Sequence, residues 1–167
     1  MIDLETLASE SSDAAIIQIG AAFFDYEDPI MEAFSILVHP EGAMEFDTLQ
    51  WWFRQDDAAL EVIIAKNRVP LHDALLEFTK NCEERLSKKA DFWCNGATFD
   101  FPILRSAYSR CGLLAPWHRK KAYDMRTMKM LYPDIERVEH GTHHDAGDDA
   151  IAQALWIQKA MVHHVNR

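Results

Sequence analysis

The sequence has 167 residues, of which 49% are hydrophobic and 26% are charged. These proportions are those of a soluble globular protein and exclude a disordered chain, and the length suffices for one domain, residues 1–167, with a core of its own. The 17 Lys and Arg residues against 27 Asp and Glu residues leave a net charge of −10, which argues against a broad, sequence-independent grip on duplex nucleic acid. The charge is compatible with an enzyme that takes only a strand end, because bound metal ions can supply the positive charge that the protein lacks.

Membrane and disulfide-rich classes are also disfavoured. No apolar run approaches the roughly 20 residues that span a bilayer, and no charged-then-apolar leader precedes the first motif, so we expect a cytoplasmic protein with no membrane partner. The three cysteines, Cys82, Cys94 and Cys111, include no C-x-x-C pair. We expect them to be reduced, buried thiols that act as small apolar groups.

The first part of the chain predicts three strands. Met1–Thr6 is the end of a first strand, with only two apolar residues before Asp3. Ala14–Phe24 is rich in β-forming and apolar residues and predicts a second strand, and Ala33–Val38 predicts a third after a turn at residues 25–29. Three sequential strands joined by short turns predict an antiparallel meander.

The middle of the chain changes to a helical pattern. Asp47–Ala65 predicts two short helices, with Asp47 and Asp56 as caps. A longer helix begins near Pro70, whose ring suits a first turn. The apolar residues of this helix recur on one face, and they are Leu71, Ala74, Leu75, Phe78, Cys82 and Leu86.

Short strands and helices then alternate. Asp91–Cys94 predicts a strand, and Phe101–Cys111 predicts a helix that Gly112 stops. Ala122–Asp124 predicts a last short strand, followed by a helix through Leu131.

After a polar loop, Asp145–Val162 predicts a final amphipathic helix. Its expected apolar stripe is Ala150, Ala154, Ile157 and Met161, widened by Ile151, Leu155 and Val162. Meander strands followed by alternating helices and short strands predict an α/β fold, a mixed sheet covered by helices.

Two carboxylates come together at the start of the chain. Asp3 and Glu5 are two residues apart on an extended segment, so both side chains point to the same face. Like charges at that separation repel unless a positive charge sits between them, and a hard divalent cation with oxygen ligands suits that place. Short acidic runs are common, so this pair is informative only if distant carboxylates converge on it.

Asp100 is the first such candidate. It follows the strand that ends at Cys94 and the dipeptide Asn95-Gly96, and it lies in the first turn of the next helix. The carboxyl end of a strand is where open α/β sheets tend to place their sites. The alternative is that Asp100 only favours the helix macrodipole.

Asp149 is the second candidate, and it comes with His144. Residues five apart lie about 140° apart on one helix, so the two side chains converge only if the helix starts between them. Asp145 as N-cap, with Asp148 three residues later, resembles a capping box and places the start there. His144 is then on the preceding loop. A zinc site of His140, His143, His144 and a cysteine is the weaker alternative, because no cysteine has ligand spacing.

These motifs resemble those of the DEDDh branch of DnaQ-like 3′–5′ exonucleases, in the same order and at similar distances over almost the whole chain. The motifs are Asp3-x-Glu5, Asn95-Gly96-Ala97-Thr98-Phe99-Asp100 and His144-x-Ala146-x-x-Asp149-Ala150. Further segments resemble a narrower group that contains exoribonuclease AS and the nuclease segment of phage-type exodeoxyribonuclease VIII. These segments are Gln18-Ile19-Gly20-Ala21, Gln50-Trp51-Trp52 and Asp124-Met125-Arg126-Thr127.

The resemblance implies a ribonuclease-H-like fold and two-metal hydrolysis of phosphodiesters. The implied ligands of two Mg²⁺ or Mn²⁺ ions are Asp3, Glu5, Asp100 and Asp149. His144 would act as general base on the attacking water. Members of the narrower group tend to be dimers, so a homodimer is a further expectation.

The same resemblance suggests where the substrate lies. The terminal 3′ hydroxyl is expected near the backbone of Asp3–Thr6, with Trp51 or Phe101 stacked on a base; the alternative for both aromatics, and for Trp52, is a place in the core. Arg126 and the basic segment Arg119–Lys121 would guide the strand, or form a solvated loop.

We therefore expect a 3′–5′ exonuclease that acts on single-stranded ends or 3′ overhangs, on RNA first and on DNA second. Two alternatives remain. One is a hydrolase of small nucleotides or dinucleotides that uses the same site. The other is a catalytically silent nucleic-acid-binding module.

Overall fold

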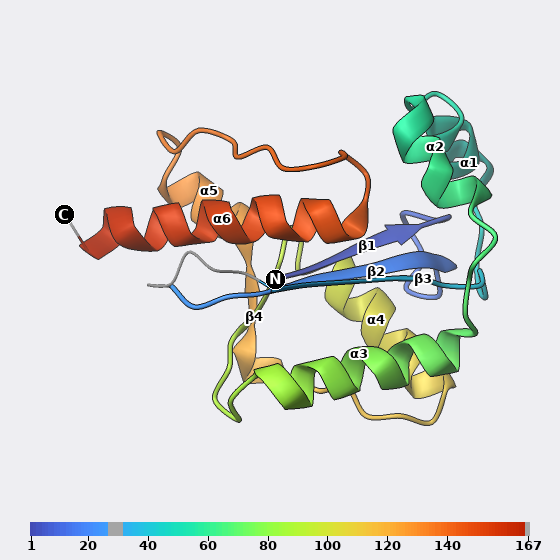
Figure 1. The fold of residues 1–167 in the computed structure, drawn as a ribbon, viewed down its shortest axis with the longest axis horizontal. Coiled ribbons are helices and arrows are strands. Elements are labelled where there is room, and N and C mark those ends of the chain that lie inside the picture. The colour runs from blue at the N-terminus through green and yellow to red at the C-terminus, as the bar shows by residue number, and fades with distance from the viewer. Residues whose placement is uncertain (27–31, 166–167) are drawn as a thin grey trace.

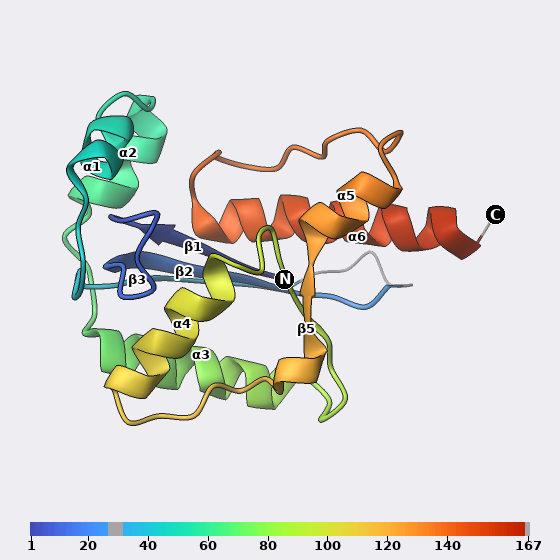
Figure 2. The same cartoon turned by 180° about the vertical axis from the view of Figure 1, so that it is seen from behind.

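The fold is seen in a computed structural model that describes residues 1–26 and 32–165. Five strands form one sheet in the order β3-β2-β1-β4-β5 (Figures 1 and 2). Pairs β1–β2 and β2–β3 are antiparallel, and pairs β1–β4 and β4–β5 are parallel. The strands are β1 (Ile2–Thr6), β2 (Ile16–Phe23), β3 (Glu32–Leu37), β4 (Phe92–Cys94) and β5 (Ala122–Asp124). The meander and the mixed sheet are confirmed, and the turn expected at residues 25–29 lies largely outside the described residues.

Helices cover both faces of the sheet. Helices α5 and α6 lie on one face and α3 and α4 on the other, while α1 and α2 stand beside the end of β1 (Figures 1 and 2). The helices are α1 (Phe46–Trp52), α2 (Asp57–Ile64), α3 (Leu71–Arg85), α4 (Asp100–Arg110), α5 (Met125–Leu131) and α6 (Ala146–Val165), with a 3₁₀ turn at Arg119–Lys121. No described helix combines the length and the apolar character that crossing a membrane requires.

The first strand, which has only two apolar residues before Asp3, lies at the centre of the sheet. Met1 is buried and extends the pairing, since its N-terminal amine donates to Ala22 O at 2.8 Å and Ala22 N donates to Met1 O at 2.9 Å. Ile2 and Leu4 pack in the cluster on the α3 and α4 side. Alternation along β1 therefore sends the intervening acidic residues to the opposite face.

Two helix faces test the expected apolar stripes. The five expected apolar positions on α3 are buried, and Leu86, the residue directly after the helix, is half-buried. On α6, Ala150, Ala154 and Ile157 are buried as expected, but Val162 is 55% exposed and the stripe widens through Trp156 and Ala160 instead. The reason is that the segment after α5 packs there, with Trp156 Nε1 donating to Ile135 O at 3.2 Å.

The predicted caps are partly right. Asp56 caps α2 and accepts from Ala59 N at 2.9 Å. The cap expected at Asp47 is wrong: α1 is preceded by Glu45, which makes no cap bond and whose carboxylate accepts from Ser9 N at 2.8 Å. All three cysteines are free thiols; two are buried and Cys111 is half-buried.

Candidate active site

Strand β1 presents two carboxylates to the start of α6. Asp3 pairs with Gly20 of β2, and Glu5 pairs with Gln18. Directly opposite residues of an antiparallel pair share a face, so the two acidic side chains, the amide and the glycine all face α6. A register irregularity between Glu5 and Thr6 ends the regular pairing at this point.

Gln18 and Gly20 determine where α6 begins. The Gln18 side chain is only 2% exposed; its Oε1 accepts from Ala146 N at 3.0 Å and its Nε2 donates to an Asp145 carboxylate oxygen at 2.8 Å. A Cβ atom on Gly20 would lie 2.0 Å from Ala146 O, so the first turn of the helix rests directly on the strand. The two residues thus hold α6 against the acidic face of β1.

The turn before α6 brings His144 beside Asp149. Asp145 is the N-cap, accepting from Gly147 N at 2.9 Å and Asp148 N at 3.1 Å. The second half of the expected capping box is absent, because the Asp148 carboxylate accepts from Thr142 N at 2.7 Å instead. His144 has a left-handed backbone with φ 66°, and its N–H donates to an Asp149 carboxylate oxygen at 3.0 Å.

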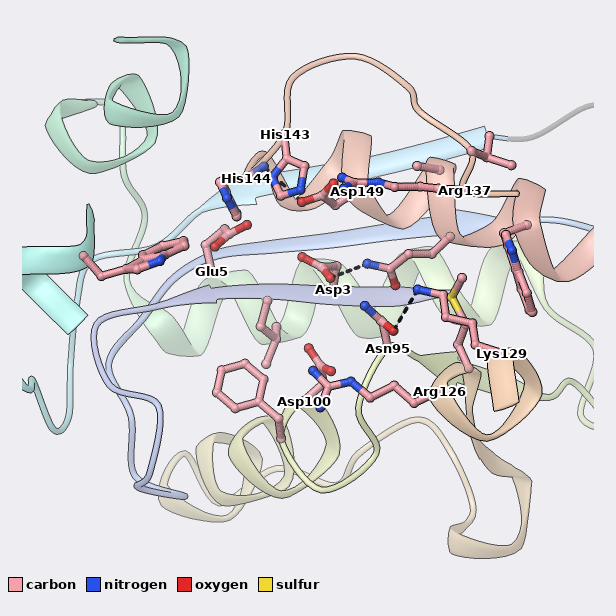
Figure 3. Close-up of a pocket in the computed structure, with 18 residues that line it drawn as sticks. Asp3, Glu5, Asn95, Asp100, Arg126, Lys129, Arg137, His143, His144 and Asp149 are labelled. Carbon is pink, nitrogen blue, oxygen red and sulfur yellow. Dashed lines mark hydrogen bonds between the residues drawn. The ribbon is translucent and has the colours of Figure 1, made fainter. Parts of the chain in front are cut away.

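The predicted acidic residues meet in one pocket. Ligand oxygens of Asp3, Glu5 and Asp149 lie within 4.8 Å of one another. Asp100 approaches from the first turn of α4, across β1 from α6 (Figure 3). All four line a pocket of about 500 Å³ together with His144.

These carboxylates are crowded, and no described cationic side chain is in direct contact with them. Burial, and then the charge of Asp100, raises the pKa of Asp3 well above its usual value. Burial and the neighbouring Asp149 charge raise the pKa of Glu5 to about 8, and burial raises the pKa of Asp100 to about 7. Glu5 is 7% exposed, and no cationic side chain among residues 1–26 and 32–165 lies within 4.0 Å of any of the four carboxylates.

The imidazole of His144 is held by aromatic rings. Its ring centroid lies 4.8 Å from that of Trp51 and 3.9 Å from that of His143, both edge-on. Burial and the His143 charge lower the pKa of His144, while the Asp149 charge opposes them. A lowered pKa favours the neutral ring, which is able to accept a proton. His143, His144 and Asp149 form a potential ligand group without a cysteine, unlike the zinc site considered above.

Comparison with known proteins identifies the family. Residues 1–161 match the family described as the 3′–5′ exoribonuclease Rv2179c-like domain. The chain belongs to this family. It is also 30% identical over 120 residues to an exodeoxyribonuclease of Enterobacteria phage T4, a match that covers 62% of this chain and 52% of that protein. The chain thus spans about half the length of that relative.

A solved structure shows the same fold. The crystal structure of cell-death related nuclease 4 (CRN-4) aligns with a TM-score of 0.53 and 14% identity, covering 97% of this chain and 63% of that one. The identity is low, so this likeness concerns the fold alone. With the observed strand order, it confirms the expected ribonuclease-H-like α/β class.

Of the residues expected near the substrate, some line the pocket and others do not. Trp51 is 41% exposed and lines the pocket, and Arg126 lines it as well. Phe101 is 6% exposed and packs on Trp117 in the core, so it cannot stack on a base. The Thr6 hydroxyl, at the end of β1, donates to Ala8 O at 2.7 Å.

Trp52 and the basic segment Arg119–Lys121 both lie outside the lining of the pocket. Trp52 is a core residue whose Nε1 donates to Thr6 O at 2.9 Å, which ties α1 to the end of β1. The segment Arg119–Lys121 lies before β5 and does not line the pocket, and Lys121 forms an ion pair with Asp91 at 2.7 Å.

Several pocket residues were not anticipated. Phe99 precedes α4 and lines the pocket. Gln153 Nε2 donates to Asp3 Oδ1 at 2.7 Å, and its i+4 spacing from Asp149 is a signal that could have found it. Lys129 and Arg137 also line the pocket, but nothing in their local sequence indicates which way α5 and the following loop fold.

Proposed function

We propose that this chain is a metal-dependent 3′–5′ exonuclease of the DEDDh type. It would remove nucleotides from single-stranded ends or 3′ overhangs, with RNA favoured over DNA. The observation that carries the proposal is the meeting of Asp3, Glu5, Asp100 and Asp149 in one pocket, with His144 beside them. Membership of a 3′–5′ exoribonuclease family supports the direction and the reaction class.

The donor set fits hard divalent cations. Asp3, Glu5 and Asp149 offer carboxylate oxygens within 4.8 Å of one another, and carboxylate oxygens suit Mg²⁺ and Mn²⁺. The nearly buried Glu5 carboxylate has no cationic partner among the described side chains, a state that costs free energy unless a cation relieves it. Two bound ions would polarise the scissile phosphate and acidify a water molecule.

His144 would accept the proton of the attacking water. Its lowered pKa keeps the imidazole neutral before the reaction, and the Asp149 charge beside it favours the imidazolium that forms on proton transfer. The edge-on contact with Trp51 fixes the direction of the ring. Gln18 and Gly20 act indirectly, by holding the helix start from which His144 and Asp149 project.

The terminal base would lie between Trp51 and Phe99. A second hollow of about 400 Å³ adjoins the first pocket and shares Leu4, Glu5, Trp51 and Phe99 with it. Aromatic side chains give sequence-tolerant stacking with the bases of single strands. Thr6 also lines this hollow, next to the β1 backbone where we expect the 3′ hydroxyl.

The choice of sugar rests on the family description. The family model that spans residues 1–161 is named for an exoribonuclease, whereas the phage relative is named as an exodeoxyribonuclease and is matched over a shorter part of the chain. RNA is therefore the first substrate to test and DNA the second.

The decisive assay uses matched 5′-labelled RNA and DNA strands, single-stranded and with 3′ overhangs, in Mg²⁺ or Mn²⁺. The expected result is a ladder that shortens by one nucleotide at a time, and an Asp149→Asn protein purified in parallel should give none. Absence of cleavage of both polymers in both metals would refute the proposal. Faster turnover of dinucleotides than of longer strands would favour a small-nucleotide hydrolase, and tight binding without cleavage would favour a silent binding module.

A further inference from the structure

A basic group lines the carboxylate pocket. Arg126 and Lys129 project from α5, and Arg137 projects from the loop between α5 and α6. None of the three forms an ion pair with a carboxylate in the part of the chain that the structure describes. The pocket thus holds three cations beside the four carboxylates, and none of these cations is in direct ion-pair contact with a described carboxylate, so their side chains are available to a bound anion.

The cations are close enough to affect one another. The Lys129 ammonium donates to Asn95 Oδ1 at 3.5 Å, a neutral and long contact. Burial lowers the pKa of Lys129, and the charges of Arg137 and Arg126 lower it further. Lys129 has no carboxylate within 4.0 Å among the described residues, so a bound phosphate oxygen would give its ammonium a direct partner and reduce the repulsion within the group.

The basic group lies on one side of the pocket only. In Figure 3, the Lys129 side chain lies on the opposite side of Asp3 from Glu5 and His144, and Arg137 reaches from that same side toward Asp149. Trp51, one of the two aromatic residues proposed to stack on the terminal base, contacts His144 and so lies on the Glu5 side of the pocket. A strand whose last base stacks on Trp51 must therefore pass the carboxylates, and its upstream part would then run past Lys129 and Arg137.

Arg126 differs from the other two cations. Its guanidinium lies beside Asp100 in Figure 3, and its charge lowers the pKa of that carboxyl against the larger effect of burial. It packs against Gly96, where a Cβ would lie 3.2 Å from Arg126 Cζ. Arg126 therefore belongs with the carboxylates proposed to bind metal. Lys129 and Arg137 are left as the basic residues available to another phosphate of the strand.

We propose that Lys129 and Arg137 bind the phosphate next upstream of the scissile phosphodiester. The inference rests on the proposed exonuclease function, because it assumes that the 3′ end of the strand lies at the carboxylates and that the rest of the strand runs away from them. It predicts a substrate with at least two consecutive phosphates, so that strands are bound better than dinucleotides. It also provides local positive charge for a strand on a protein whose overall charge repels it.

The test is a double-mutant cycle in which charge is removed from the protein by substitution and from the strand by a methylphosphonate. Binding of fluorescein-labelled strands is measured by anisotropy in Ca²⁺, with a gel check that no strand is cut. One strand carries a neutral methylphosphonate at the second linkage from the 3′ end, and a second strand carries it at the fifth linkage. On the native strand, Lys129→Gln and Arg137→Gln should each weaken binding about tenfold, as should the second-linkage methylphosphonate with the wild-type protein.

Coupling between the two changes decides the inference. The second-linkage methylphosphonate should cost the Lys129→Gln and Arg137→Gln proteins no more than about twofold, while Lys80→Gln, an exposed charge on α3, should keep the full tenfold sensitivity. Equal sensitivity in all the proteins would overturn the inference. It would also be overturned if these variants lost as much kcat/KM on a nucleotide ester with a single phosphate as on a strand.

Failure here and failure of the proposed function are distinguishable. The binding cycle needs no turnover, so a protein that shows the coupling but never cuts a strand supports the phosphate site and refutes the exonuclease. An active exonuclease without the coupling refutes the phosphate site alone.

Discussion

Replacing Gly20 by alanine tests whether the contact between β2 and α6 positions the catalytic groups. The added Cβ would lie 2.0 Å from Ala146 O and 2.5 Å from Gly147 N, both backbone atoms. Ordinary contact begins at 3.4 Å, so the first turn of α6 must retreat by 3.4 − 2.0 = 1.4 Å. That movement stretches the 3.0 Å bond from Ala146 N to Gln18 Oε1.

The expected cost is moderate for stability and large for activity. Overpacking costs about 1–3 kcal/mol and a weakened hydrogen bond about 1 kcal/mol, so the free energy of unfolding should fall by about 2–4 kcal/mol. A small domain usually survives such a loss. Asp149 lies one turn along the displaced helix, and misplacement by about 1 Å can lower a rate about 100-fold. We therefore expect a folded protein with kcat reduced at least about 100-fold.

The assay is cleavage of a labelled strand, combined with urea unfolding of the same preparation. Gly112→Ala is the matched control, because Gly112 has φ +68° but no atom within 4 Å of the added Cβ. It should cost about 1–2 kcal/mol of backbone strain and leave the rate unchanged. Full activity of Gly20→Ala, or an equal loss of activity in both variants, would refute the positioning argument.

Four further outcomes test the site itself. Asp149→Asn removes a charge while keeping shape, so Mg²⁺-dependent cleavage should be abolished without loss of thermal stability; retained activity would exclude a metal-ligand role. His144→Ala should lower kcat by about 100- to 10,000-fold with little change in strand affinity, and an unchanged rate would mean that another group is the base. Phe99→Ala should raise KM for a strand about 5- to 100-fold by removing base stacking, measured by steady-state kinetics; no change would move the base elsewhere. Burial raises the pKa of Glu5 from 4.5 to about 8, so between these pH values the folded metal-free protein holds a proton that the unfolded chain has lost, and its stability should fall as the pH rises. Urea unfolding in EDTA checks this, with a flat or rising profile against it, and Mg²⁺ should restore stability at the upper end of the range.

The sheet and the acidic constellation were predictable because their signals are local and repeat along the chain. Alternation placed Asp3 and Glu5 on one face, and the cap at Asp145 separated His144 from the helix that carries Asp149. These features depend on a few neighbouring residues. Their convergence also requires α6 to lie close to β2, which the missing side chain of Gly20 permits and which was not anticipated from the sequence.

The errors arose where tertiary packing decides the outcome. Phe101 was expected either on a base or in the core, and it lies in the core: α4 begins at Asp100, so Phe99 faces the pocket and Phe101 turns inward. A shift of two positions at a helix start is beyond what sequence patterns resolve. Likewise, Trp156 instead of Val162 is buried on α6, because the segment after α5 covers that flank of the helix.

The backbone of His144 determines which substitution can isolate the role of its imidazole. A left-handed φ of 66° is unfavourable for alanine, and the N–H of this same residue holds the Asp149 carboxylate. Alanine therefore removes the ring and also loosens the turn that orients the Asp149 carboxylate. Asparagine tolerates this conformation, so His144→Asn separates the chemistry of the side chain from the geometry of the loop that carries it.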